Sequence, residues 1–293
     1  MSDASPKREL PIPPAATALA RETARLASFP AVWLALREAI EDPGSSLDEV
    51  CAILKRDPAL VAGLLRIANS AWFGHGRQVA SLPQAASLLG MFRIHDFVLA
   101  TSVIRAFPRV PAELFDMSRF WRASLLAATA ARRLADAEQI VDSDRVFLHG
   151  LLAQIGRLVA LLRRPDDCRA LLAATGGRLR GLAALERQRW GYDYADLGAA
   201  LIDAWGLPSE FALPVFAHLA PGRRIAASPV VGLTHVAVAV AVGIDAEDDV
   251  ADIAAAVEFG AWEYFGLTPA SFTALVDFTR TETAKLASLF VAA

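Results

Sequence analysis

Cysteine is scarce in this sequence. Its 293 residues include two cysteines, Cys51 and Cys168, and both stand within apolar helical patterns. Two isolated cysteines exclude a disulfide framework and a zinc site built on cysteine pairs. We therefore expect both to be buried thiols in a reducing compartment, and we predict a cytoplasmic protein.

An excess of charge of one sign is also missing. The 29 lysines and arginines face 32 acidic residues, and the formal net charge is -3. A general nucleic-acid binder needs a positive field that concentrates a polyanion, and this chain has no such global field. Local clusters of arginine keep a nucleic-acid or nucleotide binder open as an alternative, and they lie at residues 163–164, 178–180, 187–190 and 223–224.

One apolar stretch of the chain invites comparison with a bilayer span, and it is too short for one. The stretch 230–244 is interrupted by Gly232, Thr234 and His235, and it is shorter than the ~20 residues that a spanning helix needs. Residues 1–18 are polar and rich in proline, without the apolar core of a signal peptide. These patterns predict a buried helix at 230–244 and no membrane partner.

Helix-start and helix-stop signals recur along the chain. Ser46 and Glu49 form a capping box, Asp57 precedes a proline at a first helical position, and Ser81 stands before a further helix. Gly90 falls where a helix should stop. The alternation typical of half-buried strands is almost absent. The sequence therefore predicts an all-α fold, a compact bundle of many helices.

Metal-dependent hydrolysis on a helical scaffold needs histidines and carboxylates that converge on one ion. Of the five histidines, His95 is the one that forms a credible pair, with Asp96. Adjacent residues on a helix point about 100° apart, so this pair would hold a metal poorly. The acidic run at 245–249 is better explained as a solvated turn that opens the next helix. We predict no metal and no cofactor.

Other catalytic schemes have no candidate either. The sequence contains no Gly-x-Ser-x-Gly elbow, no glycine-rich phosphate loop with lysine, and no recognisable Cys/His arrangement. His149 stands alone on an apolar helix, where a hydrogen-bonded core residue is commoner than a ligand. The residues by themselves predict a helical binding or scaffold protein.

One segment, residues 71–80, has no helical period and combines aromatic side chains with two glycines. Such a shaped loop is a candidate binding surface. We expect Asn69 and Ser70, just before it, to hydrogen-bond the helix end rather than a ligand. Trp72 and Phe73 either pack inward as anchors or, if exposed, form hot spots for a partner.

A series of motifs runs in order through most of the chain. The most specific are residues 64–70 (LLRIANS) and 150–158 (GLLAQIGRL). The whole series spans Phe29 to about Pro221. Its other members are Phe29-Pro30, residues 46–50, 57–60, 73–74, 84–85, 88–90 and 120–121, Glu186, Gly191, residues 198–199 and 205–208, His218 and Pro221. This series resembles the HDOD domain, a catalytically degenerate relative of the HD phosphohydrolases found in bacterial signalling proteins.

The resemblance implies two helical halves packed against each other. We expect residues 1–14 to be a flexible lead-in and residues 15–110 to form the N-terminal helical half. Residues 111–293 are expected to form the degenerate HD-like half with the C-terminal helices.

The name-giving His-Asp pair of the catalytic relatives is replaced in this chain. Where the family pattern reads Leu-Leu-His-Asp-Ile-Gly, Ala153 and Gln154 occupy the two central positions. Ala123 and Leu219 stand where relatives often carry histidine, and Val238 aligns with a late aspartate of active enzymes. Aliphatic side chains have no donor atom, and a neutral amide is a poor substitute for carboxylate. The resemblance therefore implies that the protein is not an enzyme.

What the resemblance implies instead is a regulatory module of signal transduction. It would bind another signalling protein or a small ligand, with a nucleotide and a homo-oligomer both left open. The degenerate site forms either an interhelical pocket or a collapsed core, and we favour collapse because protein interiors are close-packed. The alternative is a metal-dependent phosphohydrolase, or a cyclic-dinucleotide phosphodiesterase, with non-standard ligands. The candidate residues for ligand or partner binding are Asn69, Ser70, Trp72, Phe73, His149, Gln154, Trp205, His218 and His235.

Overall fold

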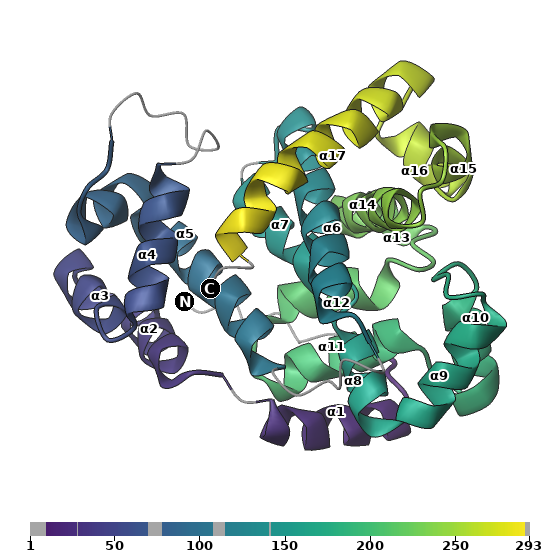
Figure 1. The fold of residues 1–293 in the computed structure, drawn as a ribbon, viewed down its shortest axis with the longest axis horizontal. Coiled ribbons are helices and arrows are strands. Elements are labelled where there is room, and N and C mark those ends of the chain that lie inside the picture. The colour runs from purple at the N-terminus through teal and green to yellow at the C-terminus, as the bar shows by residue number, and fades with distance from the viewer. Residues whose placement is uncertain (1–9, 28, 70–77, 108–114, 141, 291–293) are drawn as a thin grey trace. The chain divides into compact units, whose positions relative to one another are not determined.

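The computed structural model describes residues 10–27, 29–69, 78–107, 115–140 and 142–290. Every regular element in these ranges is a helix, from α1 to α17, and no strand occurs in them (Figure 1). The predicted all-α fold class is confirmed. The chain divides into two compact units, which we call the smaller unit (Ser28–Pro108 with Ala284–Ala293) and the larger unit (Met1–Ala27 with Arg109–Thr283). The predicted boundary between the halves, at residues 110–111, lies outside the described residues.

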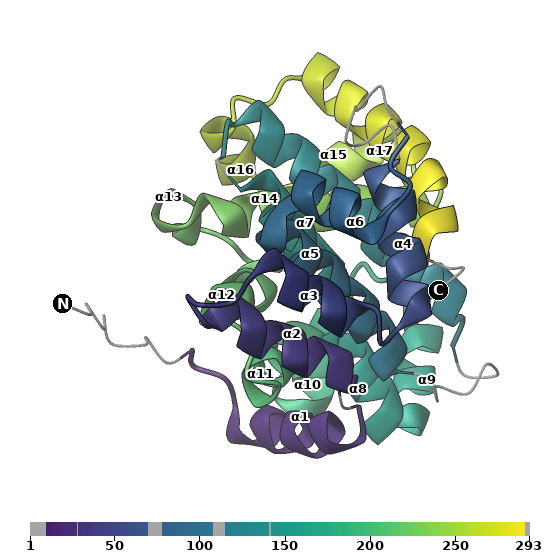
Figure 2. The ribbon, with the colours of Figure 1, turned by 90° about the vertical axis from the view of Figure 1, so that its left-hand side faces the viewer.

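The smaller unit contains α2 (Ala31–Glu41), α3 (Leu47–Leu54), α4 (Pro58–Ala68) and α5 (Leu82–Ala106), shown in Figure 2. The predicted N-caps are confirmed. The Ser46 hydroxyl accepts the Glu49 N–H at 3.2 Å, and the Asp57 carboxylate accepts the Ala59 N–H at 3.0 Å. These caps start α3 and α4, because each supplies an acceptor to a backbone donor that has no partner within its helix.

Gly90 interrupts α5 without ending it. Its backbone angles, φ 76° and ψ 165°, are not helical, and the helix resumes at the next residue. A Cβ built at Gly90 would meet nothing within 4 Å, so backbone conformation and not crowding is what requires glycine here. The predicted stop is therefore a kink between two helical segments.

The larger unit is organised around two sets of contacts. In the first, α6 (Met117–Ala137) packs on α7 (Ser143–Leu152) and on α14 (Pro229–Asp245). In the second, α11 (Tyr194–Ala204) packs on α1 (Pro14–Leu26) and on two further helices, α8 (Gly156–Arg163) and α12 (Ser209–Ala217). The remaining helices of the chain are α9 (Pro165–Ala174), α10 (Leu182–Trp190), α13 (Arg224–Ala227), α15 (Val250–Ala255), α16 (Phe259–Tyr264) and α17 (Pro269–Phe290).

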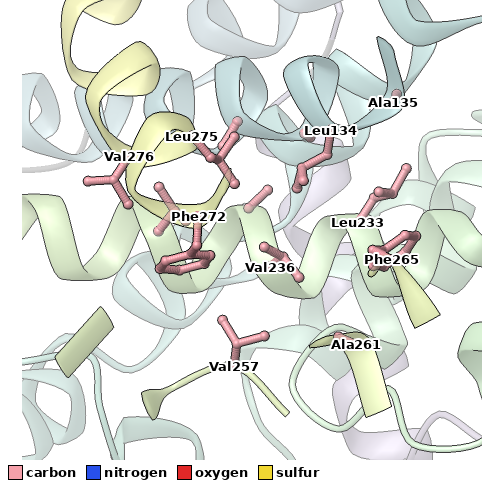
Figure 3. Close-up of a cluster of buried hydrophobic side chains, with 14 of the residues drawn as sticks. Leu134, Ala135, Leu233, Val236, Val257, Ala261, Phe265, Phe272, Leu275 and Val276 are labelled. Atoms are coloured by element: carbon pink, nitrogen blue, oxygen red, sulfur yellow. The ribbon is translucent and has the colours of Figure 1, made fainter. Parts of the chain in front are cut away.

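The C-terminal helices share a core with α6 and α14. Figure 3 shows Phe272 of α17 pointing toward Val236 of α14, with Leu134 of α6 on the opposite side of the cluster from Val257. Phe265, which follows α16, belongs to the same buried cluster. Residues 229–283 are therefore part of the larger unit and not a separate body.

The stretch 230–244 is a buried helix, as predicted, since most of α14 is enclosed by its neighbours. Two other stretches of the described chain, Leu82–Ala106 and Ser143–Arg163, are long and apolar enough to cross a membrane by length and composition. Buried residues make up 61% and 83% of their most apolar windows, and core helices of this kind pass the same test. Cytoplasmic localisation stays a prediction.

Glycine allows two pairs of helices to approach each other closely. A Cβ on Gly150 of α7 would lie 2.4 Å from the Ala127 carbonyl oxygen of α6. A Cβ on Gly156 of α8 would lie 1.9 Å from the Tyr194 carbonyl oxygen and 2.4 Å from the Gly198 nitrogen, both in α11. Since backbone atoms cannot move aside as a side chain can, these contacts fix where the segment between the two glycines lies.

We expect Gly156→Ala to lower the free energy of unfolding by more than about 3 kcal/mol, because the methyl group must push α8 and α11 apart. The matched control is Gly260→Ala in α16, whose Cβ would meet no atom closer than 4.0 Å. The control should change stability by less than about 1 kcal/mol. Urea unfolding of both variants tests this, and equal stabilities would contradict the close contact.

Candidate functional site

Asn69 is the candidate residue of the predicted binding loop that the structure describes, since Ser70, Trp72 and Phe73 lie outside the described residues. Its amide nitrogen donates to the Leu65 and Val79 carbonyl oxygens, each at 2.8 Å. Its amide oxygen accepts the Val79 N–H at 2.7 Å. Asn69 thus ties the end of α4 to the chain that returns before α5. This geometry agrees with the helix-end role expected for it.

Trp205 is likewise engaged with the backbone. Its indole N–H donates to the carbonyl oxygen of Ala27 at 2.8 Å, and 8% of the residue is exposed. Ala27 is the C-cap of α1, where carbonyl groups lack partners within the helix. The tryptophan therefore fastens α1 to the end of α11, and little of its surface is available to a ligand.

The structure brings His218 and His235 together. His235 on α14 donates from Nδ1 to the His218 carbonyl oxygen at 2.7 Å, and its Nε2 accepts the Glu258 N–H at 2.9 Å. This assignment follows from the second bond, because a backbone N–H is always a donor. Burial lowers the pKa of His235, which keeps the ring neutral as the two bonds require. His235 therefore joins α14 to the chain ends after α12 and before α16.

His218 and His149 are buried as neutral imidazoles. Burial lowers the pKa of His218 to about 4 and that of His149 to about 3. Nδ1 of His218 bonds the Val215 carbonyl oxygen at 2.7 Å, whereas its Nε2 has no hydrogen-bond partner among the described residues. The ring of His149 packs on Phe211, with 4.9 Å between centroids, and its Nδ1 also has no partner there.

The positions at which the resemblance leads one to expect metal ligands are occupied by apolar packing. Ala153 and Val238 belong to one buried cluster together with Leu126, Ala127 and Ala241. Ala123 is also buried, with 3% exposed, and Leu219 is half-buried. The helices α6, α7 and α14 thus close on each other through small side chains. This packing agrees with a collapsed core at the positions of Ala153 and Val238.

Gln154 keeps a polar contact inside this region. Its side chain is 1% exposed, and its Oε1 accepts a bond from Arg157 at 2.8 Å, while its Nε2 has no partner among the described residues. Arg157 is 9% exposed and stacks on the rings of Phe115 and Phe120, at 5.2 and 5.5 Å. Burial lowers the pKa of Arg157, and a cation this enclosed normally has a carboxylate partner. The sequence offered a weak indication of the contact between Gln154 and Arg157, since side chains three residues apart can meet in helical backbone.

The residues present do not fit the metal centre of an HD phosphohydrolase. No group of three or more potential His, Cys, Asp or Glu ligands occurs in the part of the chain that the structure describes. His235 has both ring nitrogens engaged by backbone, and Ala153 and Val238 have no donor atom. His95 and Asp96, 3.1 Å apart, form a largely buried pair in the smaller unit.

We expect Asn69→Ala to reduce the free energy of unfolding by about 1–2 kcal/mol, because three hydrogen bonds to backbone are lost. Asn69→Asp, which keeps the acceptor for the Val79 N–H but sets a carboxylate oxygen against the Leu65 and Val79 carbonyl oxygens, should lose at least as much. Chemical unfolding of the three proteins measures this. If Asn69→Ala were as stable as wild type, the structural role would be contradicted and Asn69 would again be a candidate ligand contact.

The neutral state of His149 predicts an acid-sensitive fold. A histidine with a folded pKa of about 3 and an unfolded pKa of 6.5 stabilises the protein above pH 6.5, and this contribution is lost as the pH falls toward 3. Between pH 7 and pH 5 the loss is about 2 kcal/mol. Burial raises the pKa of Glu186 to about 7, which acts in the opposite direction, so wild type and variant must be compared.

His149→Leu should therefore lose about 2 kcal/mol less stability than wild type between pH 7 and pH 5. Urea unfolding at both pH values gives the comparison. The same pH dependence in both proteins would mean that His149 is not held neutral in the fold.

Comparison with known proteins agrees with this geometry. The family model described as "HDOD domain" matches residues 26–221. A candidate phosphohydrolase from Shewanella amazonensis SB2B shares the fold with a TM-score of 0.73 and 23% identity, covering 93% of this chain and 98% of its own. An HDOD domain protein of unknown function from Geobacter sulfurreducens has a TM-score of 0.73 and 20% identity, covering 94% and 98%. Both confirm the fold alone.

An uncharacterized protein of Treponema pallidum (strain Nichols) is 26% identical over 181 residues, which are 61% of this chain. The match spans 35% of that protein's length, so its other parts say nothing about this chain. The family model, in contrast, covers well over half of the present sequence, and the residues that it matches include α2 to α12. The chain belongs to the HDOD domain family.

Proposed function

We propose that this protein is a non-catalytic regulatory module that transmits a signal by binding another signalling protein or a small ligand. The observation that carries the proposal is that Ala153 and Val238 belong to one buried apolar cluster. Hydrolysis by the HD mechanism needs donor atoms at these positions to lower the pKa of a bound water. Buried apolar side chains supply no donor atom, and close packing around them disfavours such a centre.

The histidines around the cluster support the same proposal. A metal ligand must present a ring nitrogen with a free lone pair, and His235 uses its lone pair to accept the Glu258 N–H. His149 and His218 each retain a nitrogen without a partner among the described residues, but two imidazoles are fewer than the three protein ligands of catalytic zinc sites.

The nucleic-acid alternative receives less support from the arginine clusters. Arg187 bonds Asp193 at 2.8 Å, and Arg189 bonds Asp167 at 3.0 Å. Arg163 pairs with Glu22 on α1. Since carboxylates of the same chain neutralise these arginines, they do not add up to the continuous positive stripe that tracks a phosphate backbone.

The first test is metal content together with turnover. Protein purified without chelator or metal-affinity tag should contain far less than one equivalent of Mn, Fe, Co, Ni or Zn by elemental analysis. The same sample should hydrolyse bis(p-nitrophenyl) phosphate and cyclic dinucleotides no faster than buffer, with or without added Mn²⁺.

The variant His149→Ala/His218→Ala makes the outcome interpretable. If wild type holds stoichiometric metal or turns over and this variant does not, the two histidines are ligands and the non-catalytic proposal is wrong. Activity that survives in the variant would come from a contaminant or another site.

A further inference from the structure

The larger unit contains a pocket that lies outside the degenerate site. Its volume is about 490 Å³, within the range of small-ligand sites. Three segments far apart in sequence form it: the start of α6, the turn between α9 and α10, and the end of α14 with the turn that follows. Its charged walls come from Arg119, Arg122, Arg178, Arg180, Asp245 and Asp248.

The carboxylates lie deep in this pocket and the guanidinium groups lie toward solvent. Asp245 and Asp248 expose 14% and 12% of their side chains. Arg119 and Arg122, which both pair with Asp245, expose 53% and 54%, and the two arginines of the turn are exposed to a similar degree. The aspartates therefore hold the arginines from the inner side, while the arginines and the exposed Glu247 face solvent. The prediction that residues 245–249 form a solvated turn is thus wrong for Asp245 and Asp248, which are largely enclosed. Asp249 does cap α15, as expected for a run that opens the next helix.

Among the residues that the structure describes, most hydrogen-bond donors of these arginines have no partner. Each guanidinium carries five N–H donors. Arg119 uses Nε and one terminal nitrogen on Asp245, and Arg122 uses one terminal nitrogen on the same residue. Arg180 donates to the Asp252 carbonyl oxygen, while Arg178 reaches Asp248 only at 3.5 Å. The aspartates thus hold the arginines in place while using only part of their N–H donors.

The remaining lining sets the size and shape of a ligand. Gly176 and Gly177 leave one wall without side chains, and Leu179 and Val242 provide an apolar surface. Four arginines stand against two buried aspartates and Glu247, so the charge of the lining is positive by one. A planar fork of N–H groups matches the oxygens of phosphate, and several such groups around one pocket favour a ligand with more than one negative charge.

We infer that this pocket binds a small ligand carrying a diphosphate, of the size of a nucleoside diphosphate. The volume fits a small molecule, and the net charge of the whole chain, -3, would repel a polyanion elsewhere. The inference rests on the proposed function, because it names the ligand class of that binding module.

The pocket is placed where its ligand contacts both helices of the degenerate site. Val238, Val242 and Asp245 are spaced by four and three residues, so they lie on one face of α14. On α6, Arg119 and Ala123 share a face in the same way. The inner part of the α6–α14 contact is filled by the apolar cluster, and its outer end opens into the pocket. A ligand bound there would contact both α6 and α14 and so favour one relative position of the two helices, with no reaction required.

Isothermal titration calorimetry with ADP and pyrophosphate as probes, and adenosine as the uncharged reference, tests the inference. Wild type should bind both phosphorylated probes and not adenosine. Arg178→Ala/Arg180→Ala should weaken binding at least about tenfold, because two charge-assisted contacts are lost. Glu247→Gln, which removes the acidic rim and leaves every ion pair of the arginines intact, should strengthen it.

The matched control is Arg169→Ala/Arg189→Ala, which removes the same charge from arginines exposed to a similar degree that pair with Asp166 and Asp167 outside the pocket. It should change the Kd by less than about twofold, since only general electrostatics is altered. Equal weakening in both double variants, or no binding of either probe to wild type, would overturn the inference. Neither result bears on the non-catalytic proposal, which is decided by metal content and turnover.

Discussion

The packing of α14 along α6 is the contact on which the rest of the larger unit depends. Its central part buries Leu134, Val236 and their neighbours with α16 and α17, and so attaches the C-terminal helices to the core. Further along the same contact, Val238 and Ala127 close the degenerate site, and at its end Asp245 holds Arg119 and Arg122. Burial of apolar surface contributes about 25 cal/mol per Å², so this contact stabilises all three regions together.

The apolar filling of the site has an electrostatic consequence. In the absence of a charged partner, a buried histidine is stable only as the neutral ring, and His149 and His218 accordingly have strongly lowered pKa values. Each ring atom without a partner costs about 1–3 kcal/mol relative to a satisfied one. The degenerate site is therefore not an ordinary hydrophobic core, since polar atoms inherited by the fold remain next to aliphatic packing. Its stability depends on pH for that reason.

Much of the fold was predictable because helix starts depend on residues that are close together in the sequence. Ser46, Asp57 and Ser81 cap helices through bonds that span three residues or fewer, and such bonds need no knowledge of the rest of the chain. The site was less predictable, because its contacts are long-range. The sequence predicted a solvated side chain for Asp245, because its arginine partners lie on α6, more than a hundred residues earlier in the chain. Arg157 showed no signal of burial, since its environment comes from Phe115 and Phe120 on another segment.

A module without turnover can signal only through the difference in affinity that its ligand or partner has for two arrangements of the protein. The close backbone contacts at Gly150 and Gly156 make the segment between α7 and α8 rigid, so it is a poor place for such a difference to arise. The end of α14 is different, because its position is fixed by ion pairs whose arginines are half-exposed. Exposed ion pairs contribute about 0–1 kcal/mol each, which a bound anion readily outweighs. Asp245 and Val238 lie two turns apart on the same helix, so a ligand that changes those pairs acts on the helix that also closes the site at Val238.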